Sequence, residues 1–382
     1  MNEQKICIIG DGLAGLSTAT ALSEAKIKID LYTSNNQKNK ILNDNRITAI
    51  SESSYQFIKK KMNIKNNFLV WSCKEISLYF EDKKNIKNFL NFKEDKKNLM
   101  HIFQNKKFKK ILKKKILDKK NIRLIKKKIT NINFKEGLVL IDKKIFYYDL
   151  IILCTGVHSK FYDQITHGRF IEKNYNEVAL STIVEHESKI TKASQFFLKE
   201  GPLAILPFNK NSFSVVWSVN NSFFNKNKKF LKNSLVLKIK LLLNNIKIKK
   251  VENIQSFPIK LNLKTKYFKN NILILGDGLH MVHPLAGQGF NLVLRDIKKL
   301  GELILKSSNL GLPLKNSFLL EHFSQSRKPE NIILGLGIDL THTFFKDRKY
   351  ILPFKKIILN NISNFKFVKK ISKIISNKGI SI

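Results

Sequence analysis

The feature that most constrains the fold is a glycine-rich turn between an apolar run and a helix-forming stretch near the start of the chain. Residues 5–9 read Lys-Ile-Cys-Ile-Ile, and the spacing G-x-G-x-x-G follows at once over residues 10–15. A helical stretch at 16–25 and a second strand-like run at 27–32 complete a predicted strand–helix–strand unit. In such a unit the glycines permit a tight turn, let a pyrophosphate approach the backbone, and let helix and strand pack closely. The pattern therefore predicts a dinucleotide bound at a helix N-terminus.

The residue that ends the second predicted strand departs from the usual pattern. In dinucleotide-binding folds an acidic residue about 20 positions after the glycines binds the ribose hydroxyls. Here that position is Thr33, which lacks the paired, charged contact of a carboxylate. Asp30 lies three residues earlier, inside the strand, and we expect it to face away. The ribose contact is therefore predicted at Thr33.

The most specific pattern of the chain follows a second apolar strand at 272–275 and reads GDGLHMVHPLAGQGFNLVLRD. The strand delivers Asp277 to its carboxyl end, where open α/β sheets bind ligands. Pro284 fixes a turn, and Gly287 and Gly289 clear side chains from a surface at a helix start. This arrangement suits a large planar ring with a polyol or phosphate tail, whose anionic edge the helix N-terminus favours.

At these residues the chain resembles the class A flavoprotein aromatic monooxygenases, the para-hydroxybenzoate hydroxylase type. The run H-x-x-H-P-L-A-G-Q-G-x-N-L at 280–292 is most similar to that of the ubiquinone-biosynthesis hydroxylases within this family. Residues 44–50 resemble the family's Asp-x-Arg-x-x-Ala-Leu segment, and residues 201–217 resemble its Gly-Pro-x-Ala-x-Leu-Pro…Val-Trp run. Residues 149–159 correspond to its Asp-Gly segment, in which Thr155 stands where the family has aspartate.

This resemblance implies an FAD-dependent monooxygenase that hydroxylates the aromatic ring of a polyprenylated phenol in ubiquinone biosynthesis. NAD(P)H as co-substrate would reduce the FAD, and the reduced flavin would react with dioxygen and pass one oxygen atom to the ring. The cofactor carries the difficult chemistry in such enzymes, so no catalytic side chain and no metal ligand is assigned. The residues expected to bind the cofactor are Gly10, Gly12, Ala14, Gly15, Thr33, Arg46, Asp277, Pro284, Gly287, Gln288, Gly289, Phe290 and Asn291.

The expected architecture is α/β, with a Rossmann-like FAD-binding domain interleaved with a β-sheet substrate domain and followed by C-terminal helices. The FAD-binding domain is expected to comprise residues 1–71, 99–169 and 263–315. Residues 72–98 and 170–262 would form the substrate-binding sheet, and 316–382 the helical segment. Local patterns predict a turn and a helix at 44–62, a helix at 106–120, a strand at 122–133, and helices at 228–245 and 288–306.

The net charge of +41 would ordinarily point to nucleic acid or an anionic membrane surface. Only six of the 70 basic residues are arginine, however, and proteins that read phosphates and bases favour arginine. The lysines accompany an excess of Asn, Ile and Phe, so we interpret the charge as a composition-wide bias and predict no nucleic-acid partner. In such a chain Arg46 indicates a position where the forked guanidinium matters.

Several conspicuous side chains have simpler interpretations than chemistry. His280 and His283 lack a third metal ligand at suitable local spacing, so we expect a role in the cofactor loop or a structural one. Trp217 is expected in the core of the sheet. The three cysteines lie far apart without C-x-x-C spacing, which argues against a zinc site or a disulfide framework and fits a reducing compartment.

The sequence also bears on location. It contains no run of about 18 uncharged apolar residues and no leader pattern, so we expect a cytoplasmic protein. A polyprenyl substrate resides in the bilayer, and residues 354–375 alternate lysines with apolar residues. This segment is expected either to lie on the inner face of the cytoplasmic membrane or to pack on the domain with its lysines outward.

Two alternatives from other functional classes stay open. The first is a catalytically degenerate member of the family that serves as a subunit of a ubiquinone-synthesis complex, motivated by Thr33 and Thr155. The second is a basic protein of membrane or nucleic-acid surfaces, motivated by the charge. A flavin halogenase is disfavoured because Trp71 and Trp217 cannot form that group's W-x-W-x-I-P motif.

Overall fold

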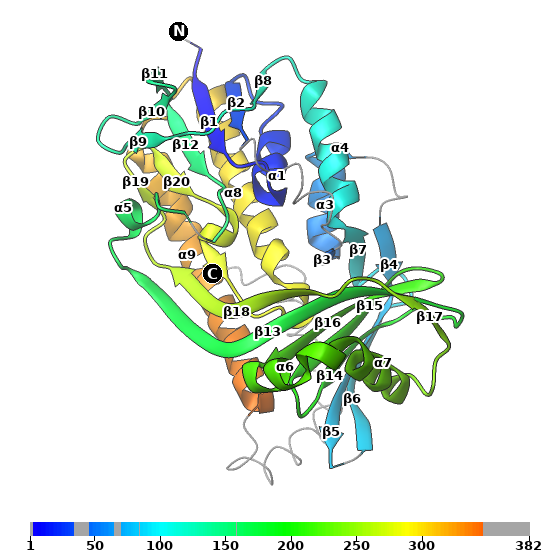
Figure 1. Ribbon diagram of the computed structural model, residues 1–382. Helices are drawn as coiled ribbons and strands as arrows, with labels where there is room; N and C mark the ends of the chain where they lie inside the picture. Colours follow the sequence, from blue (N-terminus) through cyan, green and yellow to red (C-terminus); the bar gives the residue numbers. More distant parts are fainter. Residues whose placement is uncertain (1–2, 34–45, 65–69, 84, 158, 347–382) are drawn as a thin grey trace.

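The computed structural model describes residues 3–33, 46–64, 70–83, 85–157 and 159–346 (Figure 1). The segment 354–375, for which a membrane contact is expected, lies outside these residues, as does the start of the 44–50 motif. Among the described helices, none combines the length and the apolar composition that a membrane crossing requires. Two larger sheets organise the fold, and the α/β architecture expected from the sequence is confirmed.

The first of these sheets contains the N-terminal strand–helix–strand unit. Its order is β19 (Phe268–Lys269), β20 (Ile272–Ile274), β12 (Leu150–Leu153), β1 (Lys5–Ile9), β2 (Lys28–Tyr32) and β8 (Ile122–Ile125). Strand β19 is antiparallel to β20, and the other neighbouring strands pair in parallel. Every residue of β12, and all of β1 except Lys5, is buried, as expected for a parallel sheet covered on both faces.

Helices cover this sheet and connect it to the rest of the chain. They are α1 (Leu13–Ala21), α3 (Glu52–Lys60), α4 (Asn105–Leu117), α5 (Asp163–Thr166) and α8 (Gly289–Asn309). Helix α8 passes beside α1, and α9 (Ser317–Lys346) runs from this region down to the second sheet (Figure 1). Helix α1 spans residues 13–21 rather than 16–25, because Gly12 adopts the extended conformation of an N-cap and the helix therefore begins directly after it.

The second sheet has nine strands and forms part of the wall of the cavity described below. Its order is β21 (His280–Met281), β18 (Gln255–Lys264), β13 (Phe170–His186), β16 (Ser212–Asn220), β15 (Pro202–Asn209), β14 (Ala193–Phe197), β5 (Glu75–Asp82) and β6 (Asn85–Lys93), with β17 (Ile248–Val251) paired to β13. Helices α6 (Asn221–Asn227) and α7 (Leu231–Leu242) lie against it, joined by the 3-10 helix η3 (Lys228–Phe230). Trp217 of β16 is fully buried in the core between the sheet and α7, together with Leu235 and Ile239 of that helix. This confirms its expected position.

Two small sheets complete the fold. One contains β9 (Asn131–Asn133), β10 (Leu138–Ile141) and β11 (Lys144–Tyr147), and the other contains β3 (Ile47–Ser51), β7 (Met100–Gln104) and β4 (Val70–Cys73). The prediction of a turn in the first part of 44–62 was wrong for residues 47–51, which form β3. This segment is extended because it pairs with β7, and Ile47 and Ala49 are buried in a core with Ile102 of that strand.

Two other local predictions need correction. The strand expected at 122–133 is two separate strands, β8 and β9, with the lysine run 126–128 between them. The single helix expected at 228–245 is instead two helices, α6 and α7, separated by the 3-10 helix η3. The helical region begins earlier, at Asn221, and ends at Leu242.

Candidate cofactor and substrate site

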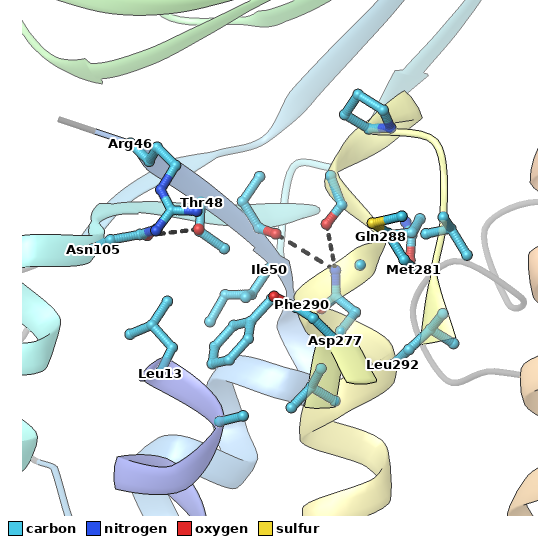
Figure 2. Close-up of a pocket in the computed structure, with 18 of the residues that line it drawn as sticks. Leu13, Arg46, Thr48, Ile50, Asn105, Asp277, Met281, Gln288, Phe290 and Leu292 are labelled. Atoms are coloured by element: carbon cyan, nitrogen blue, oxygen red, sulfur yellow. Dashed lines mark hydrogen bonds between the residues drawn. The ribbon is translucent and has the colours of Figure 1, made fainter. Parts of the chain in front are cut away.

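A cavity of about 2090 Å³ is lined by both glycine-rich segments and by the nine-stranded sheet. All the residues expected at the cofactor line it except Gly15. Figure 2 shows the region where Leu13 of α1, Asp277 and Phe290 approach one another, with Arg46 on one side and Gln288 on the other. Segments that are far apart in the sequence therefore contribute to one continuous space.

The three glycines of the first motif have different surroundings. Gly10 has φ +113°, and a Cβ there would lie 2.3 Å from the carbonyl oxygen of Cys154. A Cβ on Gly15 would lie 1.8 Å from the carbonyl oxygen of Gly10, so the strand and the helix can approach this closely only without side chains. A Cβ on Gly12 would have no protein atom within 4 Å. Gly10 and Gly15 thus serve packing, while Gly12 leaves open space on the cavity side.

The N-terminus of α1 faces this open space. Gly12 is the N-cap, and because it has no side chain no cap hydrogen bond is made. The first N–H groups of an α-helix have no acceptor within the helix, and the helix dipole places partial positive charge there. Backbone donors of α1 are therefore available to an anionic group in the cavity.

At the end of β2, Thr33 lines the cavity while Asp30 does not. The Asp30 carboxylate accepts hydrogen bonds from Arg123 at 2.7 and 2.8 Å and from the hydroxyl of Tyr148 at 2.8 Å. The carboxylate is thus fully engaged on the far side of the strand, as expected from its position. Thr33 is the strand-end residue that reaches the cavity, and its own backbone N–H bonds to the carbonyl of Ile125.

The second motif begins with the short 3-10 helix η4 (Gly276–Gly278) after β20. Asp277 is exposed to the cavity, whereas Gly276 and Gly278 are buried. A Cβ on Gly278 would lie 2.2 Å from the hydroxyl oxygen of Tyr162. Thr155, in the place of the family's aspartate, donates to that hydroxyl at 2.9 Å, and the hydroxyl donates to the carbonyl of Gly156 at 2.7 Å. The threonine therefore positions Tyr162 beneath the Asp277 turn.

The loop expected to face a planar ring runs through η5 (Leu285–Gly287) into α8. Gly287 has φ +62°, and a Cβ there would lie 3.2 Å from the Cβ of Ala49 in β3. The buried side chain of Asn291 accepts from the N–H of Ser51 at 2.9 Å and donates to the carbonyl of Gly287 at 3.2 Å. The loop is thereby fixed against β3, and Asn291 uses its carboxamide for this purpose.

Arg46 lies at the start of β3, on the rim of the cavity. Its guanidinium carbon is 5.5 Å from the ring centroid of Phe257 on β18. Beside it, the Thr48 hydroxyl donates to the carboxamide of Asn105 at 2.6 Å (Figure 2). Arg46 therefore connects the small sheet of β3 to the nine-stranded sheet, at a position on the cavity lining.

One cross-strand row of the nine-stranded sheet forms a further part of the cavity lining. Neighbouring residues of this row are paired in register across six strands, and all of them line the cavity: Ser181, Val216, Ala204, Gln195, Leu78 and Leu90. Side chains alternate between the faces of a strand, so the neighbours Leu180, Leu203 and Trp217 point instead into the core against α7. The row is apolar except for Ser181 and Gln195.

His280 lines the cavity and belongs to a buried polar network. Its Nε2 lies 2.7 Å from a carboxylate oxygen of Asp296, whose other oxygen accepts from Arg327 at 2.7 Å and from Asn331 at 3.1 Å. Burial alone would raise the pKa of Asp296, but Arg327 and His280 outweigh it and hold the pKa below its usual range. The network joins α8 to α9, which supports the structural interpretation of His280.

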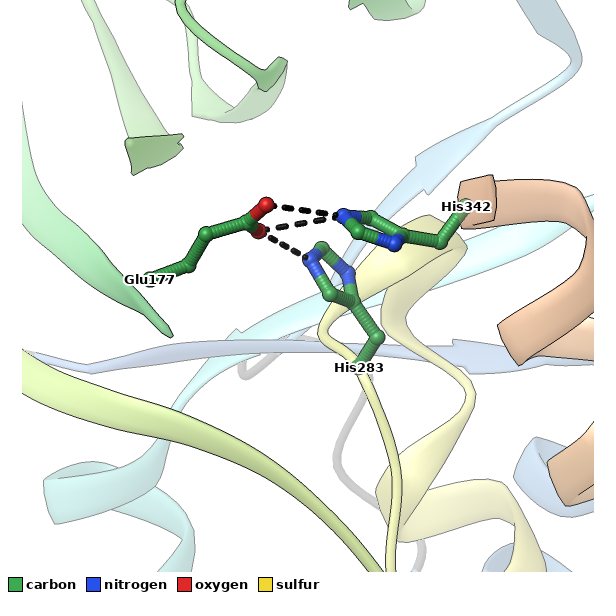
Figure 3. A group of neighbouring side chains, drawn as sticks. All are labelled: Glu177, His283 and His342. Carbon is green, nitrogen blue, oxygen red and sulfur yellow. Dashed lines mark hydrogen bonds and ion pairs between the residues drawn. The ribbon is translucent and has the colours of Figure 1, made fainter. Parts of the chain in front are cut away.

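His283 is in a second buried cluster, with partners that no local spacing indicated. Its Nε2 lies 3.2 Å from Oε2 of Glu177 on β13, and Nε2 of His342 on α9 lies 3.1 Å from the same oxygen (Figure 3). Lys346 donates to the other oxygen of Glu177 at 2.8 Å. Burial alone would raise the pKa of Glu177, but hydrogen bonds from His283, His342 and Lys346 lower it well below its usual range.

Sequence reasoning missed the residues contributed by the nine-stranded sheet and by α9. Gln195 and Ser181 occupy ordinary alternating positions of strands, and nothing in their neighbours marks the face that borders a cavity. Helix α9 contributes Ile333, Leu334, Gly337, Ile338 and Thr341 to the lining. Glu177 and His342 lie 165 residues apart, so only the folded chain brings them together.

The comparisons with known proteins agree with this geometry. Residues 148–317 match the family model described as FAD binding domain. The chain is 31% identical over 208 residues to the Dictyostelium discoideum protein named ubiquinone biosynthesis monooxygenase COQ6, mitochondrial, covering 45% of this chain and 42% of that protein. It is 29% identical to ubiquinone hydroxylase UbiL of Rhodospirillum rubrum, covering 42% and 38%. The match to the Escherichia coli 3-demethoxyubiquinol 3-hydroxylase is 27% identical and covers 40% and 39%.

These matches span less than half the length of the curated relatives. The structural likeness to solved proteins, in contrast, covers nearly the whole length of both chains. The p-nitrophenol 4-monooxygenase PnpA of Pseudomonas putida superimposes with a TM-score of 0.78 at 13% identity, covering 100% of this chain and 99% of that one. The probable FAD-dependent monooxygenase pqsL of Pseudomonas aeruginosa gives a TM-score of 0.74 at 13% identity, covering 91% and 97%. The resemblance to the class A flavoprotein monooxygenases is thus confirmed, and the chain has their two-domain fold with an FAD-binding domain.

Proposed function

We propose that this chain is an FAD-dependent monooxygenase that hydroxylates the aromatic ring of a polyprenylated phenol in ubiquinone biosynthesis, with NAD(P)H and O₂ as co-substrates. The observation that carries the proposal is the single cavity that both glycine-rich segments and the nine-stranded sheet line together. A cofactor held by the first two would face a substrate held by the third.

The residues present fit FAD. Gly12 leaves space where a Cβ would otherwise stand, next to the uncapped N-terminus of α1, which suits a pyrophosphate. Thr33 lies where the adenosine ribose would bind, and Asp277 presents an acceptor for the hydroxyls of the ribityl chain. Pro284, Leu285 and residues 287–290 border the cavity on the side where the isoalloxazine would lie. Arg46 offers paired planar donors to the same cofactor.

When bound and reduced, FAD supplies the activation of dioxygen that no side chain of this site offers. The chain's own residues would bind and orient the cofactor and the substrate, and would exclude water from the site. Asn291 holds the 284–290 loop in place through Ser51, and Tyr162 supports the Asp277 turn from below. The wall formed by the cross-strand row is mainly apolar, which keeps water from the reacting ring.

The substrate is inferred from the shape and polarity of the wall. Ala204 and Val216 leave a flat area next to Gln195 and Ser181, where an aromatic ring can lie with its oxygen substituents near the two polar side chains. The apolar residues of α9 and Leu78 and Leu90 continue the lining beyond this area and suit a prenyl chain. The names of the three curated relatives, which refer to ubiquinone, favour this class of substrate over small water-soluble phenols.

The test uses the purified full-length chain with FAD, NADH or NADPH, and a phenol carrying a short prenyl chain, under ¹⁸O₂. We expect a product that is heavier by one ¹⁸O atom, with the label in the ring hydroxyl. A yellow protein that oxidises NAD(P)H but transfers no oxygen to any prenylphenol, or a colourless one, would contradict the proposal.

The position of Thr155 favours a second candidate function, that of a catalytically degenerate family member. The Thr155 hydroxyl is engaged with Tyr162, so the carboxylate that the family has at this position has no substitute there. A protein that binds FAD without turnover, and that restores ubiquinone synthesis only together with partner subunits, would support a role as a subunit of a complex.

A further inference from the structure

The cluster of Glu177, His283 and His342 is not needed to bind FAD or substrate in the proposal above. None of its three members lines the cavity, and all three are buried, with 4%, 0% and 3% of their surface exposed. They come from β13, from the loop that precedes η5, and from α9 (Figure 3). We propose that these three side chains bind a divalent transition-metal ion of the Zn²⁺ type.

The distances between the ligand atoms support coordination. Oε2 of Glu177 lies 3.2 Å from Nε2 of His283 and 3.1 Å from Nε2 of His342, and the candidate ligand atoms of the cluster all lie within 4.8 Å of one another. Zn²⁺ binds imidazole nitrogen and carboxylate oxygen at about 2.0–2.2 Å in tetrahedral geometry, so two of its ligand atoms are separated by about 3.3–3.5 Å. The Glu177 oxygen and each imidazole nitrogen are therefore already separated by nearly the distance that a common ion requires.

Two other histidine–carboxylate pairs of the same chain serve as internal comparisons. His101 lies 2.6 Å from Glu52, and His280 lies 2.7 Å from Asp296, which are the short distances of a charge-assisted hydrogen bond. In the cluster both imidazoles lie about 0.5 Å farther from Oε2 of Glu177, and His342 is equally far from Oε1. This is the spacing of atoms arranged around a common centre.

The donor set is the one that zinc enzymes and related sites use. Two imidazoles and one carboxylate bind Zn²⁺, and they suit other first-row divalent ions as well. Lys346 is hydrogen-bonded to Oε1 of Glu177 at 2.8 Å and orients the carboxylate, of which Oε2 is the oxygen near both histidines. A solvent molecule would supply the fourth ligand.

The site has a structural consequence. Glu177 belongs to the nine-stranded sheet, His283 immediately precedes Pro284 of the cofactor loop, and His342 is near the described end of α9. One ion would thus tie the helix and the sheet to the loop that borders the proposed flavin site. Metal binding contributes to folding stability because the assembled site exists only in the folded chain.

The first test is metal binding by the full-length, tag-free protein with its FAD. After dialysis against chelator, we expect uptake of about one equivalent of Zn²⁺ by elemental analysis and an increase in Tm on addition of Zn²⁺. Co²⁺ in its place should give the intense visible absorption of a tetrahedral site. X-ray absorption at the zinc edge should show a shell of nitrogen and oxygen with two imidazoles. No uptake, or a shell that contains sulfur, would overturn the proposal.

The second test uses variants. His342→Gln and Glu177→Gln should each lower Zn²⁺ affinity by at least about tenfold and abolish the Zn²⁺-dependent increase in Tm. His186→Gln is the matched control, because His186 is also buried but lies in the nine-stranded sheet outside the cluster. Unchanged affinity in both cluster variants, or an equal loss in the control, would overturn the site. If the cluster variants do not fold, the absorption measurement on the wild-type protein decides alone. The flavin spectrum, recorded in parallel, separates this result from the fate of the proposed function.

Discussion

The carboxamide oxygen of Asn291, at the start of α8, accepts a hydrogen bond from the backbone N–H of Ser51, at the end of β3, across a distance of 2.9 Å. Both residues are buried, and 240 positions separate them. Ser51 also caps α3, because its hydroxyl accepts from the N–H of Ser54. One side chain thus fixes the loop of the second motif to the strand that begins near Arg46.

Replacing Asn291 by leucine keeps the side-chain size but leaves the Ser51 N–H buried without its acceptor. An unsatisfied buried donor costs about 1–3 kcal/mol, so we expect the free energy of unfolding to decrease by that amount. Affinity for FAD should also fall, since the loop is less firmly held. Asn291→Asp retains an acceptor and should be milder. Denaturant unfolding and flavin titration measure both effects, and an unchanged pair of values would show that the bond to Ser51 is dispensable.

Gly12 and Gly15 should respond differently to the same substitution. Gly12→Ala adds a methyl group where no protein atom lies within 4 Å, so we expect a folded protein with Tm nearly unchanged but with weaker FAD binding. Gly15→Ala would place its Cβ 1.8 Å from the carbonyl oxygen of Gly10, so we expect a large loss of stability. Thermal unfolding of the apoproteins separates the two cases. Tight FAD binding by Gly12→Ala would refute the assignment of this turn to the pyrophosphate.

Arg46 is expected to act through its forked guanidinium. In Arg46→Lys one ammonium group replaces paired planar donors, so flavin occupancy or the rate of flavin reduction by NAD(P)H should fall several-fold. The charge is unchanged, which makes lysine the appropriate comparison. Equal flavin occupancy and equal reduction rates in the two proteins would show that the guanidinium does not act on the cofactor. Arg46 would then be a surface arginine that stacks on Phe257.

Asp277 should contribute to cofactor binding through its exposed carboxylate. Asp277→Ala removes a hydrogen-bond acceptor, and we expect a loss of about 1–3 kcal/mol in FAD binding energy. Because Gly276 and Gly278 provide the packing of this turn, Tm of the apoprotein should change little. Equilibrium dialysis against FAD gives the affinity. Wild-type affinity in this variant would show that the turn does not contact the cofactor.

Much of the fold was predictable because its signals are local. The apolar runs of β1 and β12 and the glycines after β1 each define their own structure within a few residues. The glycine at position 15 was predicted to let strand and helix pack, and the clash of an added Cβ with Gly10 shows why. The start of α1 was predicted three residues late, since Gly12 supplies no side chain that would have marked the N-cap, whereas the starts of α4 and α8 were predicted to within one residue.

Strand β3 shows why the rest could not be predicted. Its sequence ITAIS has no alternation that distinguishes it from the helix that follows, and its extended conformation depends on pairing with β7. Glu177 and His342 show the same limit for side-chain clusters, because a cluster drawn from β13, a loop and α9 has no local spacing. His283 was noted in the sequence without a third metal ligand at local spacing, and its partners Glu177 and His342 are found only in the folded chain.

The polar side chain of Gln195 should decide how the substrate ring is held. Gln195 lies in the middle of the apolar row, and among the described residues its carboxamide has no hydrogen-bond partner, so it can bond to a ring oxygen. Gln195→Leu conserves the side-chain volume and removes both donor and acceptor. A site that loses a hydrogen bond to a substrate hydroxyl forfeits about 1–1.5 kcal/mol, so we expect kcat/KM to fall about 5- to 12-fold. Poor alignment of the ring should also divert more NAD(P)H oxidation to hydrogen peroxide. FAD affinity and Tm should stay at wild-type values, because Gln195 lies on the nine-stranded sheet and is not among the residues assigned to the cofactor. If instead kcat/KM for a prenylphenol and the yield of hydroxylated product were both unchanged, the ring would have to bind away from this row.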